Sequence, residues 1–121
     1  MSNIIKGGCF CGLVRYSFNF GEYPSANCYC SICRRTSGAP FVSWLAIPVN
    51  LFKYLNSRPK KIKSSSHGNR FFCEECGTPI ACTLEEDPKN INITIASLDN
   101  PEEFVPKDDI YLEDMLDWLK K

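Results

Sequence analysis

Apolar and polar residues alternate over several short segments of the chain, as they do in strands that bury one face. Residues 91–96 follow this pattern most closely, and residues 13–20 follow it as well. Residues 41–47 are rich in strand-forming side chains and end at Pro48, and residues 78–84 have a similar character. Strands therefore dominate the pattern, which predicts a mainly β fold.

Turn-forming residues separate these segments. Glycine, proline, serine and asparagine favour a loop over 21–27 and turns over 36–40 and 87–90. The polar stretch 57–69 predicts an exposed turn or a short strand. Residues 49–55 have mixed periodicity, which favours neither a helix nor a strand.

The C-terminal tail has a different period. Four of its apolar residues have helical spacing, namely Leu112, Met115, Leu116 and Leu119. We therefore expect a short helical turn over 115–119 that packs Trp118 onto the core.

Length and composition fit one globular domain. The chain has 121 residues, of which 44% are hydrophobic and 23% are charged, so we expect a single domain over residues 1–121. No apolar run approaches the roughly 18 residues that a membrane span needs, and the N-terminus lacks the apolar segment of a secretory signal. These features predict a cytoplasmic protein. The formal net charge of zero disfavours nucleic acid as a partner.

Cysteines give the main chemical signal. The chain has eight of them, in three groups and one single residue: Cys9 and Cys11; Cys28, Cys30 and Cys33; Cys73 and Cys76; and Cys82. A secreted disulfide framework is one explanation for so many cysteines. The close spacings and the missing secretory signal favour metal sites in a reducing compartment instead. Sets of thiolates at such spacings are typical of zinc.

The two outer pairs predict one closed zinc site. Sulfurs around a tetrahedral zinc lie roughly 3.8 Å apart, whereas side chains two residues apart on a flat strand lie roughly 6.6 Å apart. Cys9 and Cys11 can share a metal only if the backbone bends, which the flanking glycines permit. Cys73 and Cys76 have the usual spacing of a zinc knuckle. A site closed by these four thiolates is structural, because its binding energy is folding energy.

The central group predicts a different kind of site. Cys28, Cys30 and Cys33 supply three thiolates to one metal and leave its fourth position open. A thiol in that position would be held as the nucleophilic thiolate, and a carbonyl oxygen there would be polarised. Arg34 and Arg35 follow at once. They either bind a carboxylate of the substrate or form a surface pair that screens the thiolates.

Two other residues leave alternatives open. Cys82 either adds a fourth thiolate that closes the central site or is a small buried apolar residue in a strand, and we favour the second interpretation. His67 is the only histidine and lies in a polar segment, which gives little support to a role as catalytic base.

The order of these motifs resembles that of one known family. Three motifs carry the resemblance: Gly8-Cys9-Phe10-Cys11-Gly12-x-Val14-x-Tyr16; Cys28-x-Cys30-Ser31-x-Cys33-Arg34-Arg35-x-x-Gly38-Ala39; and Phe72-Cys73-x-x-Cys76-Gly77-x-Pro79, with a later strand that ends in Ser97-Leu98-Asp99. From Gly8 to Trp118 the chain is thereby similar to the glutathione-dependent formaldehyde-activating enzyme (GFA) family.

The resemblance implies a β-tent fold of curved antiparallel sheets with zinc-ribbon-like metal sites. It implies two zinc ions, a structural one held by Cys9, Cys11, Cys73 and Cys76 and a catalytic one held by Cys28, Cys30 and Cys33. The implied reaction joins the thiol of glutathione to formaldehyde and gives S-(hydroxymethyl)glutathione, formally a carbon–sulfur lyase reaction in reverse.

Two hypotheses of function follow. The first is a zinc-dependent carbon–sulfur lyase that acts on a small thiol such as glutathione and on formaldehyde or a related aldehyde. In it the three central cysteines form the catalytic group, and Arg34 or Arg35 binds the anionic thiol. The alternative is a non-catalytic, zinc-stabilised β scaffold that binds a protein partner, with Cys82 closing the second site. The sequence does not predict an oligomeric state.

Overall fold

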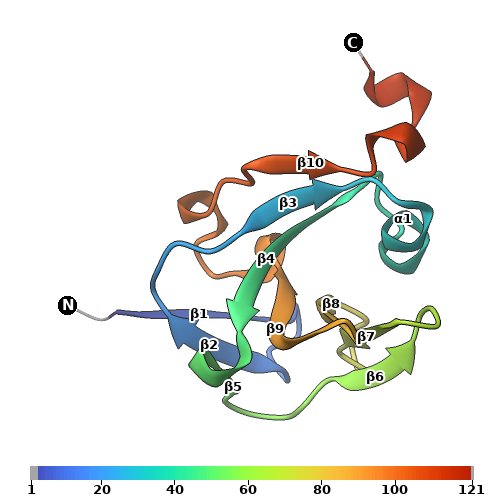
Figure 1. Cartoon of the computed structure of the whole chain (residues 1–121). Helices are drawn as coiled ribbons and strands as arrows, with labels where there is room; N and C mark the ends of the chain where they lie inside the picture. Colours follow the sequence, from blue (N-terminus) through green and yellow to red (C-terminus); the bar gives the residue numbers. More distant parts are fainter. Residues whose placement is uncertain (1–2, 121) are drawn as a thin grey trace.

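Two curved sheets make up most of the fold (Figure 1). The computed structural model describes residues 3–120, and within them the smaller sheet has three strands and the larger has seven. The smaller sheet has the order β1 (Ile4–Gly8), β2 (Arg15–Asn19), β5 (Phe52–Tyr54). The larger sheet has the order β10 (Asp108–Ile110), β3 (Ser25–Cys28), β4 (Val42–Pro48), β9 (Asp87–Thr94), β8 (Pro79–Leu84), β7 (Gly68–Phe72), β6 (Lys60–Lys63). The expectation of a mainly β fold with curved sheets is confirmed.

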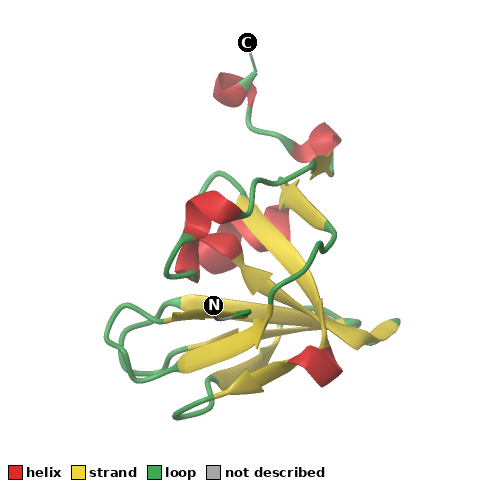
Figure 2. Ribbon diagram, turned by 90° about the vertical axis from the view of Figure 1, so that its left-hand side faces the viewer, coloured by secondary structure: helices red, strands yellow, loops and turns green. Residues whose placement is uncertain are grey.

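Helical segments are short and lie outside the sheets (Figure 2). The α-helix α1 spans Ser31–Ser37. The 3-10 turns are η1 (Val49–Leu51), η2 (Ile95–Ser97), η3 (Pro101–Glu103), η4 (Leu112–Asp114) and η5 (Asp117–Leu119). Among residues 3–120, no helix is long and apolar enough to cross a membrane. Neighbouring strands in this part of the chain are antiparallel, except β3 and β10, which run parallel.

The main core lies between the small sheet and the central strands of the large one. Its largest side chains, each at most 1% exposed, are Tyr16, Phe18, Leu45, Ile47, Ile80 and Ile93. Strand β4 is buried on both faces. Leu45 and Ile47 point into this core, whereas the alternate residues Val42 and Trp44 belong to a second buried cluster on the other face. That second cluster also contains Cys28, Cys33 and Cys82.

The four predicted strands are present with shifted ends. Segments 13–20 and 78–84 contain β2 and β8, whereas segments 41–47 and 91–96 overlap β4 and β9. The turn predicted over 87–90 is wrong, because these residues form the first half of β9 and the turn lies at residues 85–86 instead. The backbone N–H of Glu85 donates to the carbonyl of His67 there. The loop predicted over 21–27 is partly wrong, since β3 begins at Ser25.

The C-terminal tail departs furthest from its prediction. It does form 3-10 turns, η4 and η5, but it extends away from both sheets in Figures 1 and 2. Trp118 is 67% exposed, so the expectation that it packs onto the core is wrong. Helical spacing predicts which residues share a face, but it does not require that a core covers that face.

Candidate metal centres

The first group of cysteines begins with a tight turn after β1. The backbone N–H of Cys9 donates to the carbonyl of Val14 (3.0 Å), and that of Gly12 donates to the carbonyl of Cys9 (3.2 Å). Gly12 has a φ of 84°, in the left-handed region that favours glycine. A side chain at Gly8 would overlap the backbone oxygen of Val14. The glycines next to this pair therefore provide the bend that the sequence predicts.

A second turn of similar design joins β7 to β8. The N–H of Cys73 donates to the carbonyl of Thr78 (3.0 Å), the N–H of Gly77 donates to that of Cys73 (2.7 Å), and Gly77 has a φ of 83°. The Thr78 hydroxyl connects the two turns. It lies 3.2 Å from the sulfur of Cys76 and accepts the backbone N–H of Phe10 at 3.1 Å.

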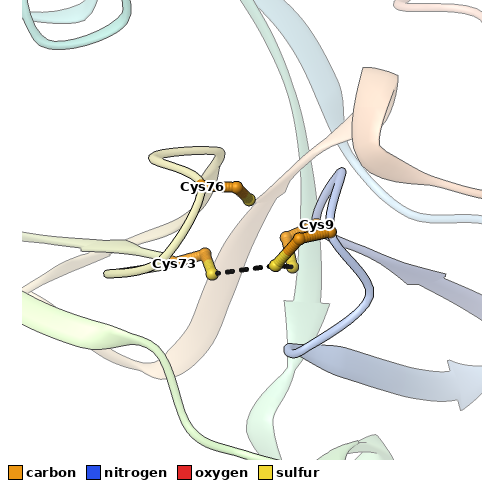
Figure 3. A group of neighbouring side chains, drawn as sticks. Cys9, Cys73 and Cys76 are labelled. Atoms are coloured by element: carbon orange, nitrogen blue, oxygen red, sulfur yellow. Dashed lines mark hydrogen bonds between the residues drawn. The ribbon is translucent and has the colours of Figure 1, made fainter.

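The two turns bring four sulfurs together (Figure 3). The sulfurs of Cys9, Cys11, Cys73 and Cys76 all lie within 4.8 Å of one another. The Cys9–Cys11 and Cys11–Cys73 sulfur distances are 3.6 and 3.7 Å, close to the roughly 3.8 Å spacing around a tetrahedral zinc. These distances are far too long for sulfur–sulfur bonds, and all eight cysteines are free. The donor set and its spacing fit a thiophilic metal ion.

The three central cysteines form a second group of sulfurs, again within 4.8 Å of one another. Cys28 ends β3, and Cys30 is the N-cap of α1, where its sulfur accepts the backbone N–H of Cys33 at 3.3 Å. Cys28 and Cys33 are buried, whereas Cys30 is partly exposed. This group also fits one metal ion, and it supplies three ligands where the first group supplies four.

A cavity of about 510 Å³ opens onto the second group. All three central cysteines line it. Part of its wall is one row across four strands, in which Ala46, Asn92, Cys82 and Arg70 are successive pairing partners on β4, β9, β8 and β7. Residues paired directly across antiparallel strands point to the same face, so the pairing of the strands assembles this wall. His67 lines the same cavity.

Arg70 is the cation that contacts the second group. Its Nη1 and Nη2 atoms each lie 3.5 Å from the Cys33 sulfur and donate to it. Its Nε donates to the Ser64 hydroxyl at 3.3 Å, and its guanidinium carbon lies 5.4 Å from the centre of the Trp44 ring. The Trp44 indole N–H also donates to the Cys33 sulfur at 3.4 Å. Hydrogen-bond donors from Arg70 and Trp44 therefore converge on the Cys33 sulfur.

These contacts favour negative charge on Cys33. A hydrogen bond from Cys28 is the largest cause that lowers the pKa of Cys33; burial raises that pKa, and the donors of Arg70 and Trp44 lower it further. The same Cys28–Cys33 bond, together with burial, raises the pKa of Cys28. Burial is the largest single effect on the pKa of Arg70 and lowers it, but the hydrogen bonds to Cys33 and the nearby charges of the Cys82, Cys33 and Cys30 thiolates together raise this pKa.

Arg34 and Arg35 lie elsewhere. They are on α1 and line a separate groove together with residues 38–40, Leu116 and Trp118. The structure does not bring them to the cavity, where Arg70 lies instead. Sequence reasoning missed Arg70, because its proximity to Cys33 comes from strand pairing between distant segments and leaves no signal in the local sequence.

Cys82 lies in the second buried cluster and lines the cavity. Among the described residues 3–120, it is not part of the group of three whose sulfurs lie within 4.8 Å of one another. It is 6% exposed, on strand β8. This position supports the interpretation of Cys82 as a small buried residue rather than a fourth ligand.

Replacing Cys82 with serine is therefore expected to leave the metal content of the purified protein unchanged. Metal per chain, measured by inductively coupled plasma mass spectrometry on wild type and Cys82→Ser, checks this expectation. If the variant lost one metal ion per chain, Cys82 would be a ligand and the second site would be closed.

Comparisons with known proteins found a matching family model and two similar curated sequences. The model of a family described as glutathione-dependent formaldehyde-activating enzyme matches residues 4–114. A protein of Halomonas elongata that carries this enzyme name provisionally is 29% identical over 129 residues, which cover 97% of this chain and 80% of that protein. A protein of Schizosaccharomyces pombe, named as an uncharacterized lyase, is 29% identical over 89 residues, which cover 72% of this chain and 64% of that protein.

A solved structure shares the fold. The crystal structure of a Rhodobacter sphaeroides protein superimposes with a TM-score of 0.68 and 19% sequence identity, and the match covers 86% of this chain and 98% of that one. At this identity the similarity is evidence for the arrangement of the strands and not for an activity.

Proposed function

This chain belongs to the glutathione-dependent formaldehyde-activating enzyme family, and on that premise we propose that it is a zinc-dependent carbon–sulfur lyase. It joins a small thiol, such as glutathione, to formaldehyde or a related aldehyde. The observation that carries the proposal is the second group of cysteines, which offers three sulfurs beside a cavity of about 510 Å³. A site that only stabilised the fold would be expected to supply four ligands.

In this proposal the two metal sites have different tasks. Cys9, Cys11, Cys73 and Cys76 hold a structural zinc, and Cys28, Cys30 and Cys33 hold a catalytic one. Zinc at the second site would supply a Lewis acid for a carbonyl or stabilise a thiolate. We also propose that the protein is cytoplasmic, because a reducing compartment preserves free thiols.

The reaction is an addition without any redox change. A bond forms between the thiol sulfur and the carbonyl carbon, the carbon–oxygen π bond breaks, and the proton lost by the thiol ends on the new hydroxyl oxygen. The chain's own contribution is to hold the two reactants together in the cavity. Apolar side chains such as Ile32, Trp44 and Ile110 line it.

The alternative of a non-catalytic scaffold receives less support. It requires a closed second site with Cys82 as fourth ligand, and Cys82 is not in that group of sulfurs. It also gives no role to the cavity that all three cysteines line.

The proposal is tested by measuring exchange at equilibrium. Purified, zinc-loaded protein is mixed with glutathione and ¹³C-formaldehyde, and two-dimensional exchange NMR gives the rate at which the free thiol and its hydroxymethyl adduct interconvert. This rate is expected to rise in proportion to the enzyme concentration, because a catalyst accelerates both directions equally. No acceleration with glutathione, cysteine or 2-mercaptoethanol would contradict the proposal and favour the scaffold.

A further inference from the structure

We propose that Arg70 is the positioning residue that allows the three-cysteine centre to accept an anionic thiol. It acts through Cys33, whose excess negative charge its guanidinium balances. This inference rests on the proposed function in taking a divalent metal ion at the three cysteines and a thiol as its ligand.

A count of charges shows why such a residue is needed. Three thiolates around one divalent ion leave one negative charge, and an incoming thiolate raises this to two. The centre is largely buried, with Cys28 and Cys33 at 4% and 3% exposure, so water screens that repulsion weakly. One permanent positive charge in contact with the sulfurs removes half of the excess.

Arg70 holds this positive charge next to one sulfur, that of Cys33. Both terminal nitrogens of Arg70 donate to the Cys33 sulfur at 3.5 Å. Two further contacts fix the guanidinium, one from its Nε to the Ser64 hydroxyl at 3.3 Å and one from its carbon to the Trp44 ring at 5.4 Å. A guanidinium that is already oriented loses little entropy when a ligand binds.

Strand pairing places the Arg70–Cys33 contact beside the cavity. Arg70 on β7 is the direct partner of Cys82 on β8, so both side chains point to the same face of the sheet. That face lines the cavity beside the three cysteines. An incoming thiol therefore enters next to Arg70, whereas Arg34 and Arg35 line a different groove.

The fork of donors makes arginine difficult to replace by lysine. A guanidinium can present two parallel N–H groups to one acceptor while its flat face packs on an aromatic ring, and an ammonium group can do neither in this way. A lysine at position 70 would keep the charge but lose the pair of bonds, so we expect it to restore binding only in part.

The chain provides a matched control in Arg58. Its guanidinium carbon lies 5.7 Å from the centre of the Tyr54 ring, a stacking contact like that of Arg70 on Trp44. Arg58 does not line the cavity. Arg58→Met therefore removes an arginine that lies over an aromatic ring but leaves the charge at the cysteines unchanged.

The experiment measures thiol binding directly. Wild type, Arg70→Met, Arg70→Lys and Arg58→Met are loaded with cobalt(II) and titrated with 2-mercaptoethanol, and the sulfur-to-cobalt charge-transfer absorption reports binding without turnover. Arg70→Met is expected to raise the dissociation constant about tenfold, the scale of a charge-assisted hydrogen bond. Arg70→Lys should lie between Arg70→Met and wild type, and Arg58→Met should match wild type. Circular dichroism and cobalt content establish that each variant is folded and loaded.

A second probe separates two roles of the arginine. Glutathione carries carboxylates, whereas the only charge of bound 2-mercaptoethanol is its thiolate. If Arg70→Met loses the same factor in affinity for both thiols, the result supports charge balance at the sulfurs. A loss for glutathione alone would overturn the proposal, because Arg70 would then bind a carboxylate.

Other outcomes distinguish this inference from the proposed function. If Arg70→Met bound 2-mercaptoethanol as tightly as wild type, or if folded wild type bound no thiol at all, the inference would be overturned. If wild type bound the thiol and Arg70→Met bound it more weakly, but wild type failed to accelerate adduct exchange, the inference would stand and only the proposed reaction would fail.

Discussion

Replacing Cys73 with serine is expected to unfold the chain at 37 °C and to remove the metal of the first site. Cys73 is fully buried, and its sulfur lies 3.7 Å from that of Cys11 across the junction of two turns. Binding of structural zinc contributes about 10–16 kcal/mol in zinc-finger peptides. The whole stability of a typical domain is about 5–15 kcal/mol. Loss of this site therefore removes stabilisation as large as the net stability. Thermal unfolding followed by circular dichroism, together with metal analysis, measures the effect.

Cys82→Ser is the matched control, because it places the same substitution at a buried cysteine outside both groups of sulfurs. We expect it to unfold cooperatively and within a few degrees of wild type. A Cys73→Ser protein with the melting temperature and metal content of wild type would show that this group does not stabilise the fold.

Replacing Cys30 with serine is expected to abolish activity and remove one metal ion per chain while the fold persists. Cys30 is the N-cap of α1, where its sulfur accepts the N–H of Cys33. Serine is among the preferred N-cap residues, so the start of the helix is preserved although a soft metal ligand is lost. Replacing a residue that only supports a metal ligand typically lowers metal affinity or activity about 10–100-fold. Loss of a ligand itself should lower activity more than about 100-fold. The exchange assay and metal analysis check both effects.

The comparison with Cys73→Ser makes this prediction specific. Both variants lose one thiolate, but only Cys30→Ser should keep the circular dichroism spectrum and cooperative unfolding of wild type. A Cys30→Ser protein with full activity and full metal content would refute the role assigned to the central cysteines.

The parts of the fold that the sequence predicts are those with local signals. Alternation of isoleucine with polar residues in 91–96 matches the part of β9 that faces the main core. Strand β3 carries no such pattern. Its residues Ser25 to Cys28 become a strand because they pair with β4 on one side and β10 on the other, and tertiary pairing of this kind overrides local propensity. Helix α1 is equally hard to predict, since its one buried residue is Cys33.

The candidate site also has one part that the local sequence predicts and another part that it does not. Cysteine spacing is local chemistry, and both groups of sulfurs assemble as the spacing predicts. The cation beside them is not local. Arg34 follows Cys33 in the chain, but it lies on the turn of α1 that faces another groove, whereas Arg70 reaches Cys33 from 37 positions away. Adjacency along the chain predicts ligands that share a turn, but it does not predict neighbours that strand pairing brings together. The single domain over 1–121 and the catalytic role of the three central cysteines stay predictions.

The two groups of cysteines differ in how far apart their members lie along the chain. Cys28, Cys30 and Cys33 lie in one short stretch, and an unfolded polypeptide can wrap such a stretch around an ion. Cys11 and Cys73 lie 62 positions apart, and bringing them together requires closure of a long loop. An ion that binds the unfolded chain as well stabilises the native state little. If both groups bind zinc as we propose, newly made polypeptides would, during a shortage of zinc, each trap one ion at the short stretch and still remain unfolded.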